Sequence, residues 1–443
     1  MNTLSPEWNT FLMFACLLVG LLVGYQIAFV LGAIGLGFGL WILGSDFVGS
    51  FTLNFFSVMK NYVLLAIPLF VLMGNVMERS GVSEKLYSAI YVLAGRLPGG
   101  LAVATTILAT VFAACTGVVG ASVVTMGSLS LPAMLRRGYD KYMVSGLICA
   151  AGCLGVLIPP SIMIIIYGPV AGIPVGTLFM SATGPGLLLS ALYVAYILIR
   201  CLLKPSLGPP IPLQELRQIT RKQKWKILGT SFFPPVVIIL AVLGTIFAGI
   251  AAPTEAAAVG ALAAILLAAA YGKCNRRVIG EAADSTLRTT AMILTMTACA
   301  TVFVSTFMSF GGGEVVERLM LSVPFGRAGV LVTMLVIVIF LGMFLDWIPT
   351  VLVVVPLFTP IAAKLGFDPI WFATVIIVTL QLSYLTPPFA LATFYFKSIA
   401  PPDISMADIY RSVMPYIGLQ LIAIALTIFF PGIALWLPGV FGK

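Results

Sequence analysis

Charge is scarce in this sequence, and histidine is absent from it altogether. Aspartate, glutamate, lysine and arginine make up 9% of the residues, so this chain cannot cover a water-exposed surface, for which soluble domains use roughly 25%. The lack of histidine removes the most frequent general base of enzymes. Cys149 and Cys153 lie one helical turn apart, but no histidine or second cysteine pair completes a tetrahedral metal site. We therefore expect the cysteines to be packing residues.

Long apolar runs take the place of the missing charge. Hydrophobic residues make up 60% of the chain, and we count roughly a dozen runs near the ~20 residues that cross a bilayer as a helix. Examples are Phe11 to Leu31, Leu187 to Leu203 and Val330 to Leu345. Because lipid offers no hydrogen-bond partners, such runs must be helical, with any unwound backbone shielded by protein or water. The sequence predicts an all-α polytopic membrane protein in a lipid bilayer.

The net charge of +9 does not indicate a nucleic-acid partner. Most basic residues are scattered, and the one dense cluster, Arg200 to Lys226, lies between apolar runs. Basic loops beside membrane helices stay in the cytoplasm, so we expect a cytoplasmic loop here. A second basic group, Lys273 to Arg277, follows an apolar hairpin, Ile227 to Tyr271. Two crossings return the chain to the same side, which agrees with this orientation.

The chain matches itself without gaps at one fixed offset, which places Ser122 on Thr350. The other matched pairs include Pro132 with Pro360, Gly138 with Gly366, Asp140 with Asp368, Pro159-Pro160 with Pro387-Pro388, and Tyr167 with Tyr395. Chance alignment of apolar helices would match leucine and valine, not a Pro-Pro pair and a Gly-aromatic-Asp corner. We predict two repeats, residues 1–203 and 225–443, joined by a basic cytoplasmic linker, residues 204–224.

Repeated halves are typical of secondary transporters, in which two pseudo-symmetric copies enclose a site near the middle of the bilayer. The copies are inverted if each half contains an odd number of crossings. Several apolar runs contain glycine or proline and could be re-entrant hairpins, so hydropathy leaves that number open. The transporter pattern favours inverted repeats with re-entrant hairpins and broken helices.

Each half has a Pro-Pro pair within an apolar run, at Pro159 to Ser161 and at Thr386 to Pro388. Proline removes a helical hydrogen bond and clashes with the preceding turn, so each pair should split its helix near the middle of the membrane. The split exposes carbonyls that suit a cation and N–H groups that suit an anion. Structural kinks are the alternative, which the symmetric placement in both halves disfavours.

Upstream of each Pro-Pro pair lies a second candidate helix break, Cys115 to Ser122 in the first half and Leu341 to Thr350 in the second. Asp346 lies in the later one, after a long apolar run. An acidic residue inside the membrane is unfavourable and is usually functional. We interpret Asp346 as a ligand of a coupling ion or a neighbour of one, with helix capping as the alternative. Its counterpart at the repeat offset is Val118, so the two halves cannot bind ions identically.

Three other acidic residues fit helix starts. Glu255 follows Pro253 and Thr254, a pattern that predicts a helix start with Thr254 as N-cap and acidic charge in the first turn. Asp140 and Asp368 each follow a glycine and an aromatic residue, as expected for a tight turn before a helix. We predict structural roles for all three.

These motifs together resemble the large membrane (M) subunit of the tripartite ATP-independent periplasmic (TRAP) transporters over nearly the whole chain. The resemblance rests on Leu131 to Asp140, Ile158 to Ser161, Ala252 to Val259, Gly342 to Asp346 and Leu385 to Pro388. It implies a multi-pass carrier in a bacterial inner membrane, not an enzyme. It also implies an elevator mechanism, in which a transport domain of two hairpins and their broken helices moves against a scaffold.

The resemblance implies partners and cargo as well. TRAP large subunits work with a small four-helix membrane subunit and a periplasmic substrate-binding protein. They import a small organic acid, such as a C4-dicarboxylate or a 2-oxo acid, with sodium ions as coupling ions and no cofactor. The positions that match the substrate and ion sites are Thr116, Gly117, Ser122, Pro159, Pro160, Ser161, Asp346, Thr350, Thr386, Pro387 and Pro388. Asp346, Thr350 and Ser122 are the candidate sodium ligands or neighbours among them.

The chain departs from the family pattern in two places. Many members have serines where this chain has Val118 and Val119, and an acidic residue where it has Gln381. The first-half ion site therefore loses hydroxyls, although backbone carbonyls could still serve, and the substrate need not be a C4-dicarboxylate. A carrier coupled to protons or to no ion is the main alternative.

Two other classes fit less well. An intramembrane enzyme would need clustered catalytic groups, yet the sequence has no histidine, hence no His-Glu-x-x-His zinc motif, and no paired intramembrane aspartates. A channel would need a continuous pore, whereas paired Pro-Pro breaks favour alternating access.

Overall fold

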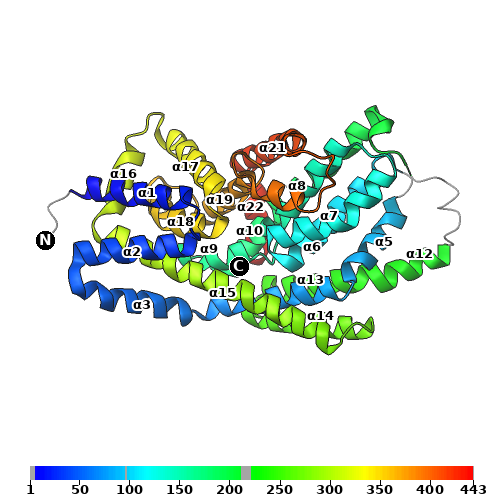
Figure 1. The fold of residues 1–443 in the computed structure, drawn as a ribbon, viewed down its shortest axis with the longest axis horizontal. Helices are drawn as coiled ribbons and strands as arrows, with labels where there is room; N and C mark the ends of the chain where they lie inside the picture. The colour runs from blue at the N-terminus through cyan, green and yellow to red at the C-terminus, as the bar shows by residue number, and fades with distance from the viewer. Residues whose placement is uncertain (1–4, 95–96, 211–220, 443) are drawn as a thin grey trace.

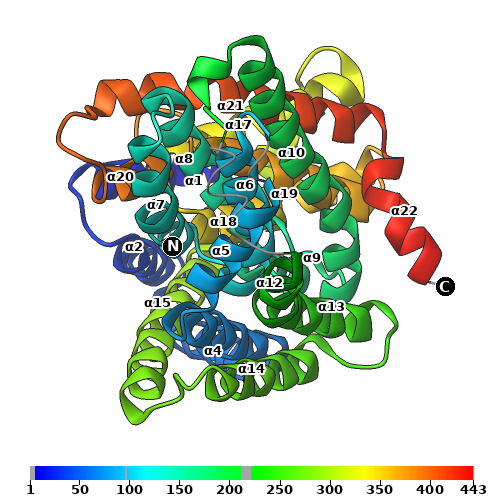
Figure 2. The ribbon, with the colours of Figure 1, turned by 90° about the vertical axis from the view of Figure 1, so that its right-hand side faces the viewer.

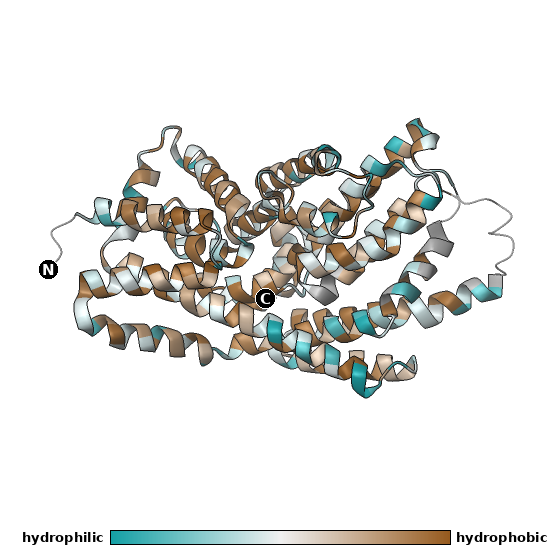
Figure 3. Cartoon of the chain, viewed as in Figure 1, coloured by the Kyte–Doolittle hydropathy of each residue, from teal (hydrophilic) through white to brown (hydrophobic). Residues whose placement is uncertain are grey.

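The computed structural model describes residues 5–94, 97–210 and 221–442, and every regular element within these residues is helical. Figure 1 shows the helices crossing in several directions rather than lying in one bundle. Hydrophobic residues cover most of their length, and hydrophilic residues gather near helix ends and loops (Figure 3). These observations confirm the predicted all-α membrane fold.

The helices follow one another closely along the chain. Those before residue 204 are α1 (Pro6–Leu22), α2 (Ile27–Leu43), α3 (Phe47–Met59), α4 (Ala66–Arg79), α5 (Val82–Ala94), α6 (Gly100–Thr116), α7 (Val119–Arg136), α8 (Lys141–Leu157), α9 (Ile162–Ala171) and α10 (Val175–Leu203). Those after residue 220 are α12 (Arg221–Ile227), α13 (Phe233–Phe247), α14 (Pro253–Ala270), α15 (Arg276–Ser309), α16 (Gly312–Leu321), α17 (Gly326–Phe344), α18 (Trp347–Lys364), α19 (Pro369–Ser383), α20 (Leu391–Lys397), α21 (Met406–Phe429) and α22 (Gly432–Phe441). Short 3-10 turns occur at Gly44–Asp46, Tyr62–Leu65 and Pro205–Leu207, and a π turn at Leu228–Phe232.

Within the described residues, nine helical segments are long and apolar enough to cross a membrane, or ten if the bent pair α8 and α9 counts as one span. Helices α1, α19 and α22 are apolar but shorter. The prediction of one continuous span from Phe11 to Leu31 is wrong, because α1 ends at Leu22 and α2 begins at Ile27. The predicted hairpin Ile227 to Tyr271 is confirmed by α13 and α14.

The longest helix, α15 with 34 residues, organises one layer of the molecule. It packs against α2, α3 and α4, and α4 packs in turn against α14. In Figure 1 these five helices run along the lower part of the molecule, and Figure 2 shows α4, α14 and α15 together at its lower edge. We call α2, α3, α4, α14 and α15 the scaffold layer. Helices α6, α7, α8, α17 and α21 lie above it in Figure 1.

Helix boundaries follow the repeat offset seen in the sequence. Helices α7 and α18 have 18 residues each, and their first residues, Val119 and Trp347, are a matched pair at that offset. Helices α8 and α19 begin at Lys141 and Pro369, which are another such pair. The two halves thus share the positions of their central helices.

The predicted capping roles of Asp140 and Asp368 are confirmed. Each carboxylate accepts a hydrogen bond at 2.8 Å from the backbone N–H three residues later, on Met143 and on Trp371. A carboxylate in this position satisfies one of the unpaired N–H groups at the helix start and contributes about 1 kcal/mol. The two equivalent corners therefore fix the starts of α8 and α19 in the same way.

The prediction that Thr254 caps α14 is wrong. The N-cap residue is Ala252, which has no side chain that could cap, and Pro253 occupies the first helical position. Glu255 takes over part of the function, because its Oε2 accepts a hydrogen bond at 2.9 Å from the N–H of Ala252. Its acidic charge in the first turn also complements the helix dipole, as predicted.

The linker region, residues 204–224, has a described part at each end, and the two parts have different structures. The 3-10 turn Pro205–Leu207 packs back onto the first half, where Leu207 accepts a hydrogen bond from the N–H of Asp140 at 3.0 Å. The N–H of Gly99 donates to Gly208 at 2.8 Å. Residues 211–220 lie outside the described residues, and α12 already begins at Arg221. The division of the chain into 1–203, 204–224 and 225–443 stays a prediction.

Helices α8 and α21 approach each other closely at Gly146. A methyl group added at this residue would overlap the carbonyl oxygen of Ser412 and approach a ring carbon of Tyr416 to 2.8 Å. The hydroxyl of Tyr416 donates to the carbonyl of Met143 at 3.1 Å, so the ring is held in place at this crossing. The absence of a side chain on Gly146 is therefore a requirement of the packing.

We predict that Gly146→Ala lowers the stability of the purified protein, because the added methyl must push apart two backbones, at about 1–3 kcal/mol for overpacking. Gly418→Ala on α21 is the matched control, since a methyl there meets no atom within 4 Å. The control should be neutral or gain up to about 1 kcal/mol from helix propensity. Thermal unfolding in detergent measures both variants, and equal midpoints for the two would contradict the close approach.

Candidate functional site

Two hairpins end in short tips between their helices. Gly117 and Val118 separate α6 from α7, and Leu345 and Asp346 separate α17 from α18. Gly117 has φ of +60°, a conformation that glycine adopts without strain. Both predicted breaks upstream of the Pro-Pro pairs are thereby confirmed.

Two broken helices accompany the hairpins, as predicted from the Pro-Pro pairs. Helix α8 ends at Leu157 and α9 begins at Ile162, with a bend of 42° between them. Ser161 is the buried N-cap residue of α9, and its hydroxyl donates back to the carbonyl of Val156. Such a bond satisfies a carbonyl that the proline break leaves without its helical partner.

The second break is longer than the first. Helix α19 ends at Ser383 and α20 begins at Leu391. Thr386 donates to the carbonyl of Leu382 at 2.6 Å, which satisfies part of the unwound end of α19. Pro388 accepts a hydrogen bond at 3.2 Å from the hydroxyl of Tyr410 on α21.

The two Pro-Pro pairs have different surroundings. Both contain a cis peptide bond. Pro159 and Pro160 are buried, whereas Pro387 and Pro388 are exposed on the surface of this chain. The chemical pattern of the two repeats is therefore similar, but the environment of the two breaks is not.

Each tip packs on the break of its own half. A methyl group added at Gly117 would approach the side chain of Ile162, the first residue of α9, to 2.9 Å. The ring of Phe344 lies 5.9 Å from that of Phe389 in an edge-to-face arrangement. The halves also interlock, since α9 packs against α18 and α20 packs against α7. The four interruptions therefore belong to one packed unit, which we call the hairpin unit (α6 to α9 and α17 to α20).

Asp346 is the acidic residue at the second tip, and the structure confirms the helix-capping alternative for it, while its role beside a coupling ion stays a prediction. It caps α18, because its Oδ1 accepts a hydrogen bond at 2.8 Å from the N–H of Trp347. Its backbone carbonyl accepts the hydroxyl of Thr350 at 2.9 Å. No donor among the described residues reaches its second carboxylate oxygen. Capping therefore leaves one oxygen of the charged group available.

A cavity of about 430 Å³ lies at this second tip. Asp346 lines it together with Tyr25 and otherwise mainly apolar residues of α1, α2, α17 and α20. The cavity therefore presents a single carboxylate against an apolar wall.

The remaining predicted residues are distributed over the first half. Ser122 is a buried residue of α7, at the position equivalent to Thr350 in α18. The backbone of Thr116 ends α6, and its side chain lies outside the described residues. In the part of the chain that the structure describes, no group of three or more His, Cys, Asp or Glu residues could hold a metal ion. A cation at these tips would be held by carbonyls, hydroxyls and at most one carboxylate.

Sequence reasoning did not predict the role of Gln381, a fully buried residue of α19. With its amide turned to satisfy both groups, its nitrogen donates to the carbonyl of Cys153 at 2.7 Å and its oxygen accepts from the N–H of Leu157 at 3.3 Å. Cys153 is the counterpart of Gln381 at the repeat offset. The two broken helices therefore cross at equivalent positions, just before the first Pro-Pro pair.

The chain is similar to several known proteins over almost its full length. Residues 14–433 match the family model described as the tripartite ATP-independent periplasmic transporter, DctM component. The chain is 32% identical to the ectoine/5-hydroxyectoine TRAP transporter large permease protein UehC of Ruegeria pomeroyi, over 96% of this chain and 97% of that protein. It is 28% identical to the C4-dicarboxylate TRAP transporter large permease protein DctM of Vibrio cholerae, again over 96% and 97%.

A solved structure has a similar fold. The YdaH transporter of Alcanivorax borkumensis superposes with a TM-score of 0.63 at 14% identity, over 98% of this chain and 99% of that one. This likeness shows that the two chains share a fold. The matched family region contains both hairpins and both broken helices, and the relatives above are named as permeases rather than enzymes. The chain therefore belongs to the DctM family, the large permeases of the TRAP transporters.

Proposed function

We propose that this chain is the large permease of a sodium-coupled importer of a small organic acid in a bacterial inner membrane. It would work with a small four-helix membrane subunit and with a periplasmic binding protein that delivers the substrate. The observation that carries the proposal is the packing of two hairpin tips on two broken helices. This arrangement gathers carbonyls, hydroxyls and one carboxylate where the helices are interrupted, as in secondary transporters.

Asp346 and Thr350 support sodium as the coupling ion. Because the hydroxyl of Thr350 donates its hydrogen to a carbonyl, its lone pairs stay free to coordinate a cation. The free carboxylate oxygen of Asp346 would add the charge. Ser122 occupies the equivalent of Thr350 in the first half, so we propose hydroxyl and carbonyl ligands there. Thr116, Gly117 and the Pro-Pro segments would supply further backbone carbonyls.

An elevator movement is the transport step that we propose. The hairpin unit interlocks across both halves through the pairs α9 with α18 and α20 with α7, which favours movement as a rigid body. The scaffold layer around the 34-residue α15 would provide the surface along which that unit moves. The substrate and the ions would travel with the tips.

The substrate class follows from the relatives, and its identity would be selected by the binding protein. Proteins 28% and 32% identical to this chain are named for C4-dicarboxylate and for ectoine and 5-hydroxyectoine. Val118 and Val119 at the first tip differ from the serines of the family pattern. We therefore propose a small carboxylate that need not be a C4-dicarboxylate.

Coupling to protons, or to no ion, is the second candidate. The observation that favours it is the single carboxylate at the second tip, because one acidic group beside an apolar cavity could carry a proton instead of a sodium ion. The two candidates differ in the cation that neutralises the Asp346 carboxylate during transport, a sodium ion in the first and a proton in the proton-coupled form of the second.

We predict that proteoliposomes with this chain, its small subunit and its binding protein accumulate one of a panel of radiolabelled carboxylates only under an inward sodium gradient. The sodium gradient is expected to supply the driving force. Potassium or choline gradients of equal ionic strength are the controls. Equal uptake in all three salts would exclude sodium coupling and leave the proton-coupled or uncoupled carrier.

We predict that Thr350→Val raises the sodium concentration for half-maximal uptake by about tenfold, the loss of about 1.4 kcal/mol of binding. The substitution keeps the shape of the side chain and removes the hydroxyl. Thr350→Ser is the matched control and should stay near the wild-type value.

Asp346→Asn should raise the sodium concentration for half-maximal uptake more than Thr350→Val does, because it removes the charge. The asparagine keeps an oxygen that can cap α18. Uptake measured over a sodium series and a pH series tests this. If Asp346→Asn keeps its sodium dependence but loses its pH dependence, protons and not sodium ions are coupled through this residue.

A further inference from the structure

Glu78 connects the scaffold layer with the hairpin unit. It is the penultimate residue of α4, and its Oε1 accepts a hydrogen bond at 2.5 Å from the hydroxyl of Thr125 on α7. Both side chains are half-buried. The bond joins a residue of the layer expected to stay fixed to a residue of the unit expected to move.

Glu78 lines a small cavity of about 70 Å³ between α4, α7 and α15. The amide of Asn75 and the hydroxyls of Ser285 and Thr289 also line it, and Val118 reaches it from the first hairpin tip. Sites for organic ligands need roughly 300 Å³ or more, whereas one water takes about 30 Å³. The cavity therefore has room for a small ion with a water, and not for an organic acid.

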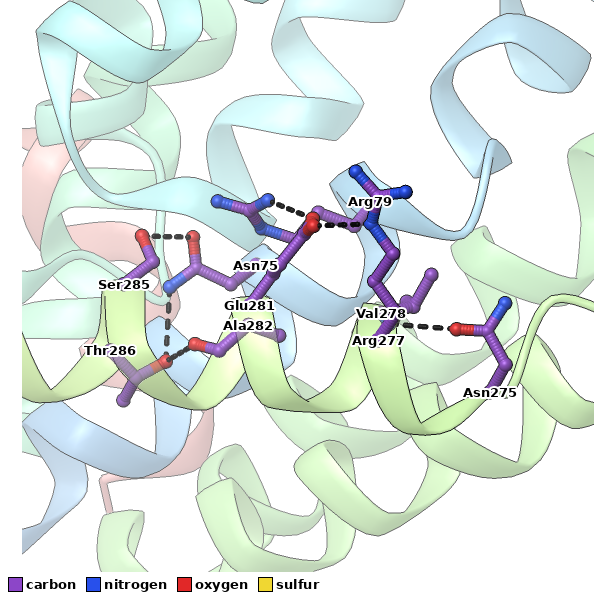
Figure 4. A network of polar contacts seen from close by, with 9 residues as sticks. All are labelled: Asn75, Arg79, Asn275, Arg277, Val278, Glu281, Ala282, Ser285 and Thr286. Atoms are coloured by element: carbon purple, nitrogen blue, oxygen red, sulfur yellow. Dashed lines mark hydrogen bonds and ion pairs between the residues drawn. The ribbon is translucent and has the colours of Figure 1, made fainter.

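The polar wall of this cavity is held in place by a hydrogen-bond network (Figure 4). Asn75 donates from Nδ2 to the hydroxyl of Thr286 at 3.0 Å, and its Oδ1 accepts from Ser285 at 3.3 Å. These bonds cross from α4 to α15 within the scaffold layer. The oxygen atoms that line the cavity thus come from a rigid part of the fold.

The charge of Glu78 has no basic partner among the residues that the structure describes. Arg79, the next residue, turns to Glu281 and lies 3.0 Å from one of its carboxylate oxygens, and Arg277 lies 2.8 Å from the other (Figure 4). Glu281 therefore has two cationic partners, while the only polar partner of Glu78 in the described part of the chain is the neutral Thr125. An uncompensated carboxylate beside a small polar cavity attracts a cation.

The repeat gives this carboxylate a counterpart. Val118 lines the cavity at the first tip, and Asp346, at the equivalent position, lines the cavity at the second tip. Each tip thus has one carboxylate in its cavity. At the second tip this carboxylate is Asp346 of the hairpin itself, and at the first tip it is Glu78 of the scaffold layer, which lines the same small cavity as Val118.

We propose that Glu78, together with oxygen atoms of Asn75, Ser285 and Thr289, binds a sodium ion between the scaffold layer and the first hairpin. Oxygen ligands with a single carboxylate suit a hard cation. The role of this ion in transport rests on the sodium coupling proposed above.

The bound ion acts on the contact between the two parts of the protein. A sodium ion in the cavity offsets the charge of the Glu78 carboxylate, so that carboxylate becomes a weaker acceptor for the hydroxyl of Thr125 and the bond between α4 and α7 weakens. Movement of the hairpin unit along the scaffold layer must break that bond. Occupancy of the site is therefore linked to the release of the first hairpin, because a ligand favours the state that it binds more tightly.

The test is equilibrium binding of radioactive sodium to the purified complex of this chain with its small subunit, without substrate or binding protein. We expect Glu78→Gln, which keeps the size of the side chain, to lose one sodium ion per chain. Thr125→Val, which removes the hydroxyl that partly offsets the charge of Glu78, is expected to bind that ion several-fold more tightly. Glu314→Gln, at an exposed carboxylate of α16, is the matched control and should bind like the wild type.

Unchanged sodium stoichiometry and affinity in Glu78→Gln would overturn the proposal. If that variant does not fold, Thr125→Val decides, because equal or weaker sodium binding there overturns the proposed link between the ion and the Glu78–Thr125 bond. Binding is read without transport, so the result separates the two proposals. A sodium ion lost in Glu78→Gln supports the site even where wild-type uptake proves independent of sodium. Normal binding in Glu78→Gln with sodium-driven uptake in the wild type removes the site and leaves the coupling.

Discussion

Inside a bilayer, a backbone N–H or C=O group finds no partner except within the protein, and the interrupted helices of this chain depend on that constraint. The Gly117 turn lies on the start of α9, and Phe344 beside the second tip packs on Phe389. The end of α8 is satisfied by Ser161, and that of α19 by Thr386. Because α9 packs on α18 and α20 on α7, the helices beside each interruption pack against the other half. The interrupted helices therefore keep part of their backbone hydrogen bonding within the protein.

The sequence predicted those features whose cause is local. A Pro-Pro pair breaks a helix wherever it stands, and both breaks are found where the prolines predicted them. Asp140 and Asp368 cap α8 and α19 because an aspartate after a tight turn reaches the N–H three residues on. The hairpin tips follow from glycine and polar residues that interrupt an apolar run. The repeat offset then paired the breaks, caps and tips of the first half with those of the second from the sequence alone.

Features that depend on distant contacts could not be predicted from the pattern. Thr254 looked like an N-cap, but the helix already begins at Pro253, and Glu255 makes the capping bond. Glu78 ends an apolar helix as an ordinary surface residue would, and only the approach of α7 and α15 gives it a cavity. Hydropathy joined Phe11 to Leu31 because it averages over the short gap between α1 and α2. In each case the structure depends on a detail that the average hydropathy or the residue pattern of one short segment does not contain.

Gln381 bonds to the backbone of Cys153, its own counterpart in the repeat, and this contact requires the two halves to differ in sequence. On the axis of a symmetric pair, equivalent residues face each other, so both must share one space. Both residues are fully buried, and a cysteine at residue 381 would leave the carbonyl of residue 153 without its amide donor. The amide of Gln381 reaches the backbone of the opposite broken helix and makes both bonds at once. The bond that joins the two broken helices thus depends on a side chain that only the second half provides, so the pseudo-symmetry of the helix positions does not extend to the contact that holds them together.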